Sequence, residues 1–450
     1  MAVLRSRGYR RILIFVAILG VPVAAAAFGF LALVSYLQKE LFIHLPHGLG
    51  YSTAPQWWPL PVLFVGGLLA GLAIRYLPGG GGPSPAGGFQ LHPPPTPVEL
   101  PGVLLAALAS LVFGTAVGPE VPVIALGSGL AVLAAKAIKN QQVQAQARPV
   151  LGAAGSFAGV STLLGSPLTG AFLVMEASGL GGQLLDVLLL PGLVASGVGA
   201  LIFVGLDRAT GLGTFSLAIP ALPPFSHPDV AEFGWAIVIG LAAAVVGPAC
   251  QWLGRVLHPY AKKWTIIALP LAGVVIAVIT IIYTEATGKP ASNVLFSGQD
   301  DMGKVIHQAA SYSVGALLLL LVCKGLAYSV SLSSFRGGPT FTALFIGAVG
   351  GIAMSHLPGL PLAAAVAMGI GAMCASELKL PIVSVLLASL LLLSDAAKVM
   401  PLVIVAVAVA YVAVTYLSPR LTGLPAPGAE PEAAFGPPPA AAEQSAKHAA

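Results

Sequence analysis

Long and short apolar runs alternate along this chain, and polar residues are confined to brief segments between them. A helix needs about 20 mostly apolar residues to cross a bilayer. Seven runs are long enough, namely 12–37, 57–77, 184–206, 234–257, 265–284, 313–333 and 399–417. Six others are shorter, namely 121–138, 150–164, 167–177, 340–355, 361–375 and 380–394. The pattern predicts an all-α integral membrane protein that contains both spanning and re-entrant helices.

Glycine and proline join the short runs to one another. Breaks of this kind leave backbone N–H and C=O groups without partners, which lipid does not tolerate. Such segments survive where protein buries them or where they line a polar cavity. We therefore expect half-membrane helices whose ends meet near the middle of the bilayer.

The short runs also repeat within the chain. Gly118-Pro119 begins an apolar run that reaches Gly127, and Gly338-Pro339 begins another that reaches Gly347, about 220 residues later. A second pair follows, with GSFAGVSTLLGSP from Gly155 to Pro167 and GAMCASELKLP from Gly371 to Pro381. Broken segments at corresponding places in two halves are typical of transporters built from inverted repeats around a midplane site.

The repeat and the loop composition together divide the chain into five parts. Four arginines precede the first apolar run, which lacks a clear cleavage site, so we expect a membrane helix with a cytoplasmic N-terminus instead of a signal peptide. Residues 421–450 are rich in alanine and proline, which predicts a disordered tail. The expected parts are a basic segment 1–11, a first membrane repeat 12–208, a linker 209–231, a second membrane repeat 232–420 and the tail 421–450.

Composition excludes several functions. The chain is 57% hydrophobic and 8% charged, which is outside the range of soluble domains. Its net charge of +5 and the absence of a basic stripe with aromatics argue against nucleic acid as a partner. The three cysteines and eight histidines have no metal-ligand spacing, and no catalytic motif such as HExxH or GxSxG occurs. We expect neither an enzyme nor a cofactor.

Four motifs in order resemble the CLC family of chloride channels and proton/chloride antiporters, over about 12–420. The strongest is GAAGSFAGVSTLLGSPLTGAFLVMEAS, residues 152–178. Gly118-Pro119 lies where the family has GREGP, and Phe335-Arg336-Gly337-Gly338 where it has GGxFxP. GGGGP at 79–83 lies where the family has GSGIP. The resemblance implies a homodimer in which each subunit has its own pore.

An anion site follows from this resemblance and from helix physics. Helix N-termini present free N–H groups and a partial positive charge, so several of them aimed at one point hold an anion without trapping it. The expected N-termini lie at Gly80–Pro83, at Gly118-Pro119 and at 338–340. The expected anion-binding residues are Gly80, Gly81, Gly82, Gly118, Gly338, Thr340 and Phe341. The alternative is that these glycines only allow close helix crossings.

The departures from the family concern its functional side chains. Val117 stands at the gating glutamate, and Ala177 at the internal proton-transfer glutamate. Ala116 replaces the arginine of GREGP, and Gly80 replaces the serine of GSGIP. Pro339 lacks the N–H that the family offers there, and no tyrosine follows Tyr416 to act as the pore tyrosine.

Valine and alanine cannot carry a proton, so the sequence predicts passive conduction of chloride or another small inorganic anion. Glu120 leaves two alternatives open: it is a displaced gate, or it stabilises a helix N-terminus through its charge. A proton-coupled chloride or fluoride antiporter that uses Glu120 and a non-conducting protein of the same fold are the rival functions. Arg336 is a candidate positive charge at a pore mouth or a surface anchor.

Other polar residues in apolar runs are expected to be structural. Glu176 should close a helix end, Lys324 should pair or reach an interface, and Asp186 and Asp395 should cap helices. We expect the protein in the plasma or inner membrane of a bacterium, in contact with lipid.

Overall fold

The computed structural model describes residues 7–137, 141–161, 163–164, 166–179, 182–215, 225–391 and 395–422. Within them the chain is helical and contains no named strand. The first half contains α1 (Arg7–Lys39), α2 (Leu45–Gly48), α3 (Pro59–Tyr76), α4 (Leu100–Val112), α5 (Glu120–Ala135), α6 (Gln141–Val160), α7 (Pro167–Ala177) and α8 (Gly182–Thr210). The second contains α9 (Val230–Lys263), α10 (Thr265–Thr287), α11 (Gln299–His307), α12 (Val314–Ser334), α13 (Thr340–Met354), α14 (Leu362–Leu378), α15 (Pro381–Leu390) and α16 (Ala396–Thr422).

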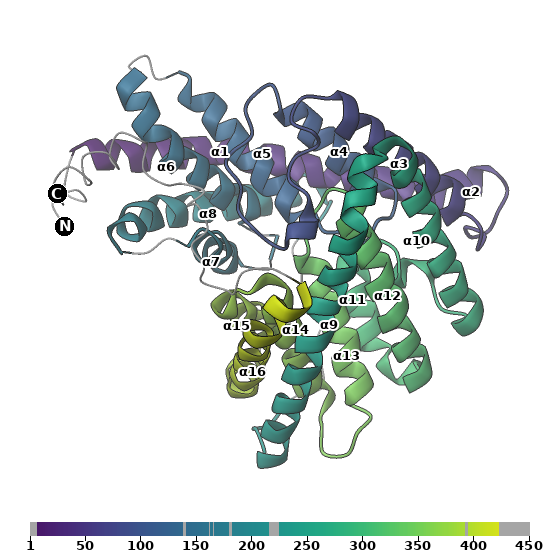
Figure 1. Ribbon diagram of the computed structural model, residues 1–450. Coiled ribbons are helices and arrows are strands. Elements are labelled where there is room, and N and C mark those ends of the chain that lie inside the picture. Colours follow the sequence, from purple (N-terminus) through teal and green to yellow (C-terminus); the bar gives the residue numbers. More distant parts are fainter. Residues whose placement is uncertain are drawn as a thin grey trace.

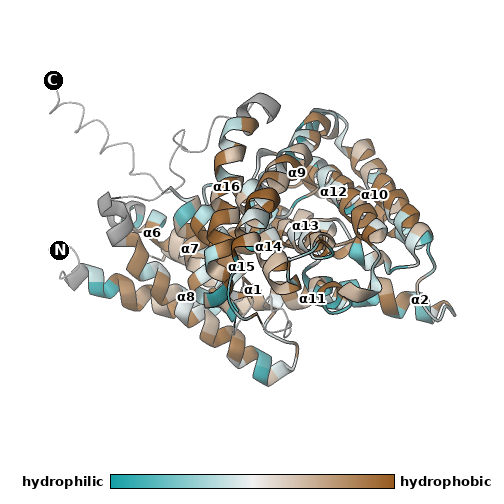
Figure 2. Cartoon of the chain, turned by 90° about the horizontal axis from the view of Figure 1, so that it is seen from below, coloured by the Kyte–Doolittle hydropathy of each residue, from teal (hydrophilic) through white to brown (hydrophobic). Residues whose placement is uncertain are grey.

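Seven of the described helices are long and apolar enough to cross a membrane. They coincide with the seven long runs of the sequence, and the prediction of an all-α membrane protein is confirmed. The outward faces of these helices carry large apolar side chains, such as Ile14, Leu201 and Leu271, each at least 60% exposed. Figure 2 shows hydrophobic residues along α9, α10 and α12, as expected of surfaces that face lipid.

Two series of four helices repeat the same succession of lengths. Helices α5 to α8 have 16, 20, 11 and 29 residues, and α13 to α16 have 15, 17, 10 and 27. In Figure 1 the first series (blue) and the second (green to yellow) lie on different sides of the molecule. The predicted internal repeat is thus present as a repeat of helices.

Matching glycines hold each series together. Gly127 of α5 lies directly against Gly155 of α6, and any Cβ on either residue would collide with the other's carbonyl oxygen. Gly347 of α13 and Gly369 of α14 form the same contact. The sequence comparison paired Gly155 with Gly371, but Gly371 packs on α16 and Gly369 makes the crossing. Small residues allow this close approach of backbones.

One of the predicted short helices is longer in the structure than its apolar run. Residues 150–160 of the run 150–164 belong to the 20-residue helix α6, which begins at Gln141, includes Pro149 and ends at Val160. The sequence between 141 and 148 is rich in glutamine, so the apolar pattern does not detect it, although glutamine is a good helix former.

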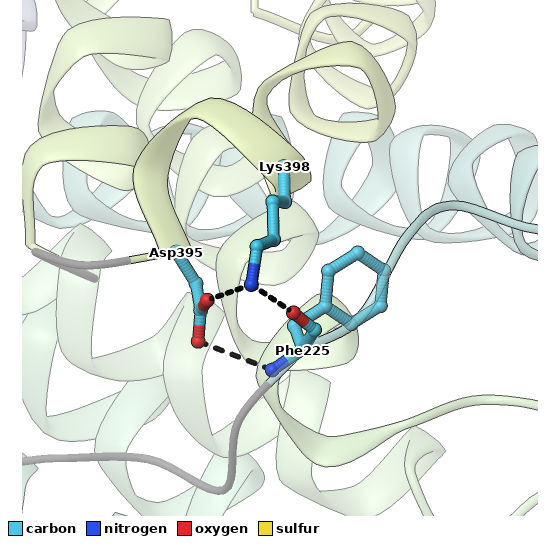
Figure 3. Close-up of polar contacts among 3 residues, drawn as sticks. All are labelled: Phe225, Asp395 and Lys398. Atoms are coloured by element: carbon cyan, nitrogen blue, oxygen red, sulfur yellow. Dashed lines mark hydrogen bonds and ion pairs between the residues drawn. The ribbon is translucent and has the colours of Figure 1, made fainter.

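Asp395 connects the segment before α9 to the start of α16. Its carboxylate accepts a hydrogen bond from the Phe225 N–H at 3.1 Å and pairs with Lys398 Nζ at 2.9 Å. Lys398 Nζ donates in turn to the Phe225 carbonyl, which closes the ring of contacts in Figure 3. Asp395 therefore fixes the start of α16 to the segment that precedes α9. The Asp186 side chain and the proposed tail from 423 onward lie outside the described residues.

Candidate functional site

The two Gly-Pro turns of the repeat meet face to face. Gly118 and Gly338 form an antiparallel bridge in which each N–H donates to the other's carbonyl at 2.7 Å. Helix α5 begins at Glu120 directly after Pro119, and α13 begins at Thr340 directly after Pro339. The N-termini of the two corresponding helices are therefore adjacent inside the protein.

Glu120 spans this junction. Its side chain is fully buried, and Oε1 accepts a hydrogen bond from the Thr340 N–H at 2.6 Å. Oε2 is buried and has no hydrogen-bond partner. The carboxylate of one repeat thus occupies the N-terminus of the helix that begins the other, where a negative charge is favourable.

Glycine at 118 and 338 makes room for this carboxylate. A Cβ on Gly338 would overlap the Glu120 carboxyl group, and a Cβ on Gly118 would lie against Oε2. The sequence predicts that these glycines let the backbone approach a bound anion. In the structure, the anionic group that they approach is the Glu120 carboxylate of the same chain.

Thr340 occupies the position in the second repeat that Glu120 has in the first. Its hydroxyl oxygen is buried without a hydrogen-bond partner. Phe341 follows it in the first turn of α13, is 1% exposed, and packs close to Gly118. The junction therefore holds two unmatched oxygen atoms, Glu120 Oε2 and Thr340 Oγ1, beside a helix N-terminus.

Val117 lies in an apolar cluster beside the junction. It is buried with Val34, Leu111 and Val112, and its side chain contacts Gly337. The preceding residue is held from both sides, since the Ala116 N–H donates to Ser331 Oγ and the Thr342 hydroxyl donates to the Ala116 carbonyl. Val117, which stands where the resemblance places the gating glutamate, is therefore packed among apolar side chains.

The glycine segment does not begin a helix as expected. Gly79 to Gly82 all have positive φ, between 55° and 84°, and form a turn that leads only to the three-residue 3₁₀ helix Pro85–Gly87. The expected α-helix N-terminus at Gly80–Pro83 is therefore wrong. A run of left-handed conformations requires glycine, and this explains GGGGP.

Arg336 lies beside this turn, two residues before Gly338. Its Nε is buried without a hydrogen-bond partner, and a side chain at Gly81 would come within 3.4 Å of it. Its backbone N–H donates to Ser110 Oγ at 3.0 Å. Arg336 is consequently part-buried near the helix junction and is not a surface anchor.

A cavity of about 350 Å³ adjoins α5. One wall is the segment 79–99, including His92 and Glu99, and the other is α5 itself from Val121, the residue after Glu120, to Ser128. The cavity therefore approaches the junction from the side of the glycine turn.

Two other polar residues hold helix ends. Glu176 accepts from the N–H groups of Ile382 and Val383 at 3.0 and 2.8 Å, so it closes the N-terminus of α15 as expected. Lys324 is 1% exposed and donates to the carbonyls of Val294, Leu295 and Phe296. It therefore neither reaches an interface nor needs a carboxylate partner.

Sequence reasoning missed the buried acid Glu377 in a short apolar helix. Glu377 is 2% exposed near the end of α14 and is hydrogen-bonded to Gln251 and Tyr328. The sequence could have indicated it, because Glu377 is the single charged residue in the apolar run 362–378. Acids inside membrane segments are usually functional.

Comparisons with known proteins agree with the fold. The family described as "Voltage gated chloride channel" matches residues 66–415. The putative ion-transport protein YfeO of Escherichia coli O1:K1 is 31% identical over 344 residues, which cover 75% of this chain and 77% of the relative.

Solved structures share the architecture. A slow cyanobacterial Cl⁻/H⁺ antiporter superposes with a TM-score of 0.70 at 22% identity, covering 90% of this chain and 95% of the other. A CLC-type fluoride/proton antiporter gives 0.64 at 18% identity, covering 92% and 98%. At these identities the likeness establishes the fold, with its two inverted repeats of broken helices.

Proposed function

Because the chain belongs to the voltage-gated chloride channel (CLC) family, whose members move anions across membranes, we propose that it transports chloride past the junction of α5 and α13. Glu120 is the gate in this proposal. Its carboxylate occupies the N-terminus of α13, and an entering anion takes its place there.

The hydrogen bond between Glu120 Oε1 and the Thr340 N–H carries this proposal. It supports an anion site because a carboxylate and a chloride ion are attracted by the same free N–H groups and the same partial charge. A tethered anion competes with a free one, so the free ion enters only when the side chain leaves. Arg336, two residues before Gly338 and beside the glycine turn, is the candidate positive charge at the pore mouth.

Several finer points rest on the family and the sequence. Val117 and Ala177 support passive conduction, whereas Glu120 supports a gated or coupled process. The cargo is chloride or another small inorganic anion such as fluoride. The protein is a multi-pass membrane protein, and we propose the plasma or inner membrane, a cytoplasmic N-terminus and a homodimer with one pore in each subunit.

Chloride efflux from liposomes tests the proposal. Purified protein is reconstituted into vesicles loaded with KCl, valinomycin is added to carry the counter-charge, and chloride is followed with an electrode. The wild type should release chloride. Glu120→Gln keeps an oxygen for the Thr340 N–H but loses the charge, and the weaker hydrogen bond should raise the efflux rate about fivefold.

Glu285→Gln is the matched control, since Glu285 is exposed on α10 and its substitution should leave efflux unchanged. Efflux from Glu120→Gln equal to that of the wild type would make Glu120 a structural cap. No efflux of chloride or fluoride from well-folded wild type would favour the non-conducting alternative over transport.

A further inference from the structure

An apolar groove lies between α3 and α4 on the surface of the protein. It has a volume of about 430 Å³, and its lining residues are all apolar apart from the Tyr76 hydroxyl. Leu72 of α3 and Leu105 of α4 are exposed along it, so the groove opens outward from the helices. Cavities that bind ligands usually have volumes of about 300–1,000 Å³, so this groove is large enough to hold one.

Close helix contacts mark the two ends of the groove. A Cβ on Gly66 would collide with the Phe113 side chain at one end, and a Cβ on Gly102 would collide with the Pro78 carbonyl at the other. Between these contacts one wall of the groove covers residues 69–77, which is roughly 12 Å at the rise of an α-helix. The groove is therefore elongated along the helices, which suits a hydrocarbon chain.

The deep side of the groove is the apolar cluster that surrounds Val117. Val112 belongs to that cluster and also lines the groove. Leu37, Leu108 and Phe113 pack against the cluster and are lining residues too. A chain in the groove therefore contacts the side chains that hold Val117, and it should stabilise the folded state there.

Two exposed lysines lie near the end of the groove at Tyr76. In Figure 1, α3 and α10 lie side by side, and a Cβ on Gly71 of α3 would come within 3.2 Å of the Thr265 carbonyl oxygen. Thr265 is the first residue of α10, and Lys262 and Lys263 are the last residues of α9 shortly before it. Both lysines are exposed, and neither is part of an ion pair among the described residues. This corner of the surface is therefore positively charged.

Aromatic side chains accompany the two lysines. Tyr260 and Trp264 flank them in the sequence and are exposed, as is Tyr76 at the end of the groove. Lys263 Nζ lies 5.6 Å from the centre of the Trp264 ring. Tyrosine and tryptophan are enriched at the level of lipid headgroups, and lysines near a membrane attract anionic headgroups. The corner therefore has the composition of a membrane–water interface.

We propose that this surface binds one anionic phospholipid, with an acyl chain in the groove of α3 and α4 and the phosphate at Lys262 and Lys263. A phospholipid joins an apolar chain to a charged headgroup, so it complements both the groove and the positive corner. Free phosphate complements only the lysines, and a zwitterionic lipid carries a positive group that the lysines repel. The candidate spans Tyr9–Gly48 and Pro59–Tyr76 are consecutive, so the lipid belongs to the leaflet on the side of the N-terminus.

Thermal unfolding of the purified protein in detergent tests the proposal, because a molecule that binds only the folded state raises the Tm. Dioleoyl phosphatidylglycerol should raise the Tm of the wild type at least twice as far as dioleoyl phosphatidylcholine at the same mole fraction. Lys262→Gln combined with Lys263→Gln should make the two shifts equal. Ala73→Leu, which enlarges a side chain that lines the groove, should at least halve the shift with either lipid.

Arg10→Gln combined with Arg11→Gln is the matched control. This exposed pair lies 26 residues or more before Leu37 on α1, roughly 40 Å from the groove along the helix, and its substitution should keep the twofold difference between the lipids. Inorganic phosphate at the concentration of the lipid should not raise the Tm.

Four results would overturn the lipid site. They are equal shifts with the two lipids in the wild type, a preference for phosphatidylglycerol that survives the lysine substitutions, the same loss of preference in the arginine control, and a shift with inorganic phosphate as large as that with phosphatidylglycerol. An unchanged shift in folded Ala73→Leu would reject the groove as the place of the chain. If Ala73→Leu does not fold, the lysine variant decides, since it changes only exposed side chains.

Discussion

At the scale of the residue, the two Gly-Pro turns at the junction have the same backbone arrangement but different side chains after the proline. Gly118 and Gly338 bond to one another symmetrically, and each is followed by proline and the first residue of a helix. The first helix then has Glu120 and the second Thr340 at the same position. A carboxylate can reach across to a helix N-terminus as an acceptor, whereas the threonine oxygen remains unmatched. One side chain thus decides which helix end is occupied.

Arg336 provides the first prediction at this scale. Its positive charge lies beside the glycine turn, two residues before Gly338, so Arg336→Gln should weaken chloride binding on the order of tenfold if the anion passes this turn. Chloride efflux measured over a range of chloride concentrations gives the half-saturating concentration. Arg75→Gln, at an exposed arginine of α3, is the control. Equal half-saturating concentrations in Arg336→Gln and the wild type would limit Arg336 to a packing role.

At the scale of the element, paired glycines set the distance between helices. Gly347 lies on the face of α13 that touches α14, and a Cβ there would come within 2.9 Å of Ile370 Cα and closer still to the Gly369 carbonyl. Gly350, one turn later, has no atom within 4 Å of the position that a Cβ would take. The same residue type therefore has different roles three positions apart.

This difference can be tested with a matched pair. Gly347→Ala should lower the free energy of unfolding by about 1–3 kcal/mol, because backbone at the crossing must move apart. Gly350→Ala should stabilise slightly, by about 1 kcal/mol at most, because alanine is the better helix former. Thermal unfolding of the two purified variants measures both effects. A loss of stability in Gly350→Ala as large as in Gly347→Ala would contradict the crossing.

At the scale of the whole molecule, apolar surface exceeds what one chain can bury. In each of the seven candidate spanning helices, more than two-fifths of the residues in the most apolar window are not buried. Lipid covers such surface readily, and part of it also suits contact with a second copy, as the family resemblance implies.

The expected assembly is a homodimer. Light scattering in detergent should give a protein mass of twice the 45.3 kDa of one chain, after the detergent is subtracted. The pores should act independently, so dimers that contain one wild-type subunit and one Glu120→Gln subunit should give efflux midway between the two pure forms. A mass of one chain would reject the dimer, and efflux equal to either pure form would reject independent pores.

Much of the fold was predictable because lipid imposes a simple rule on the chain. Runs such as 265–284 must be apolar along their whole length, and the corresponding α10 was found nearly residue by residue. The glutamine-rich start of α6 escaped, since hydropathy detects contact with lipid and not helix formation. The helix expected at Gly80–Pro83 was wrong because consecutive glycines permit a left-handed turn as well as a helix start.

The site was predictable in its backbone and not in its side chains. The Gly-Pro repeat indicated that two helix N-termini belong together, and the bridge between Gly118 and Gly338 is that meeting. Which side chain enters the junction depends on contacts between residues about 220 positions apart, and the sequence left both alternatives for Glu120 open. The hydrogen-bond partners of Glu377 come from two other helices, α9 and α12, which no local pattern connects to α14.

The sequence by itself determined the class of protein, the spanning helices and the repeat, because periodic apolar character and glycine placement act locally and through lipid. Only the tertiary structure decided that Glu120 lies at the N-terminus of α13, that Val117 is packed among apolar side chains and that Glu377 is buried beside Tyr328. Burial and hydrogen bonding of a charged group are properties of its whole surroundings, which exist only after distant segments have packed together.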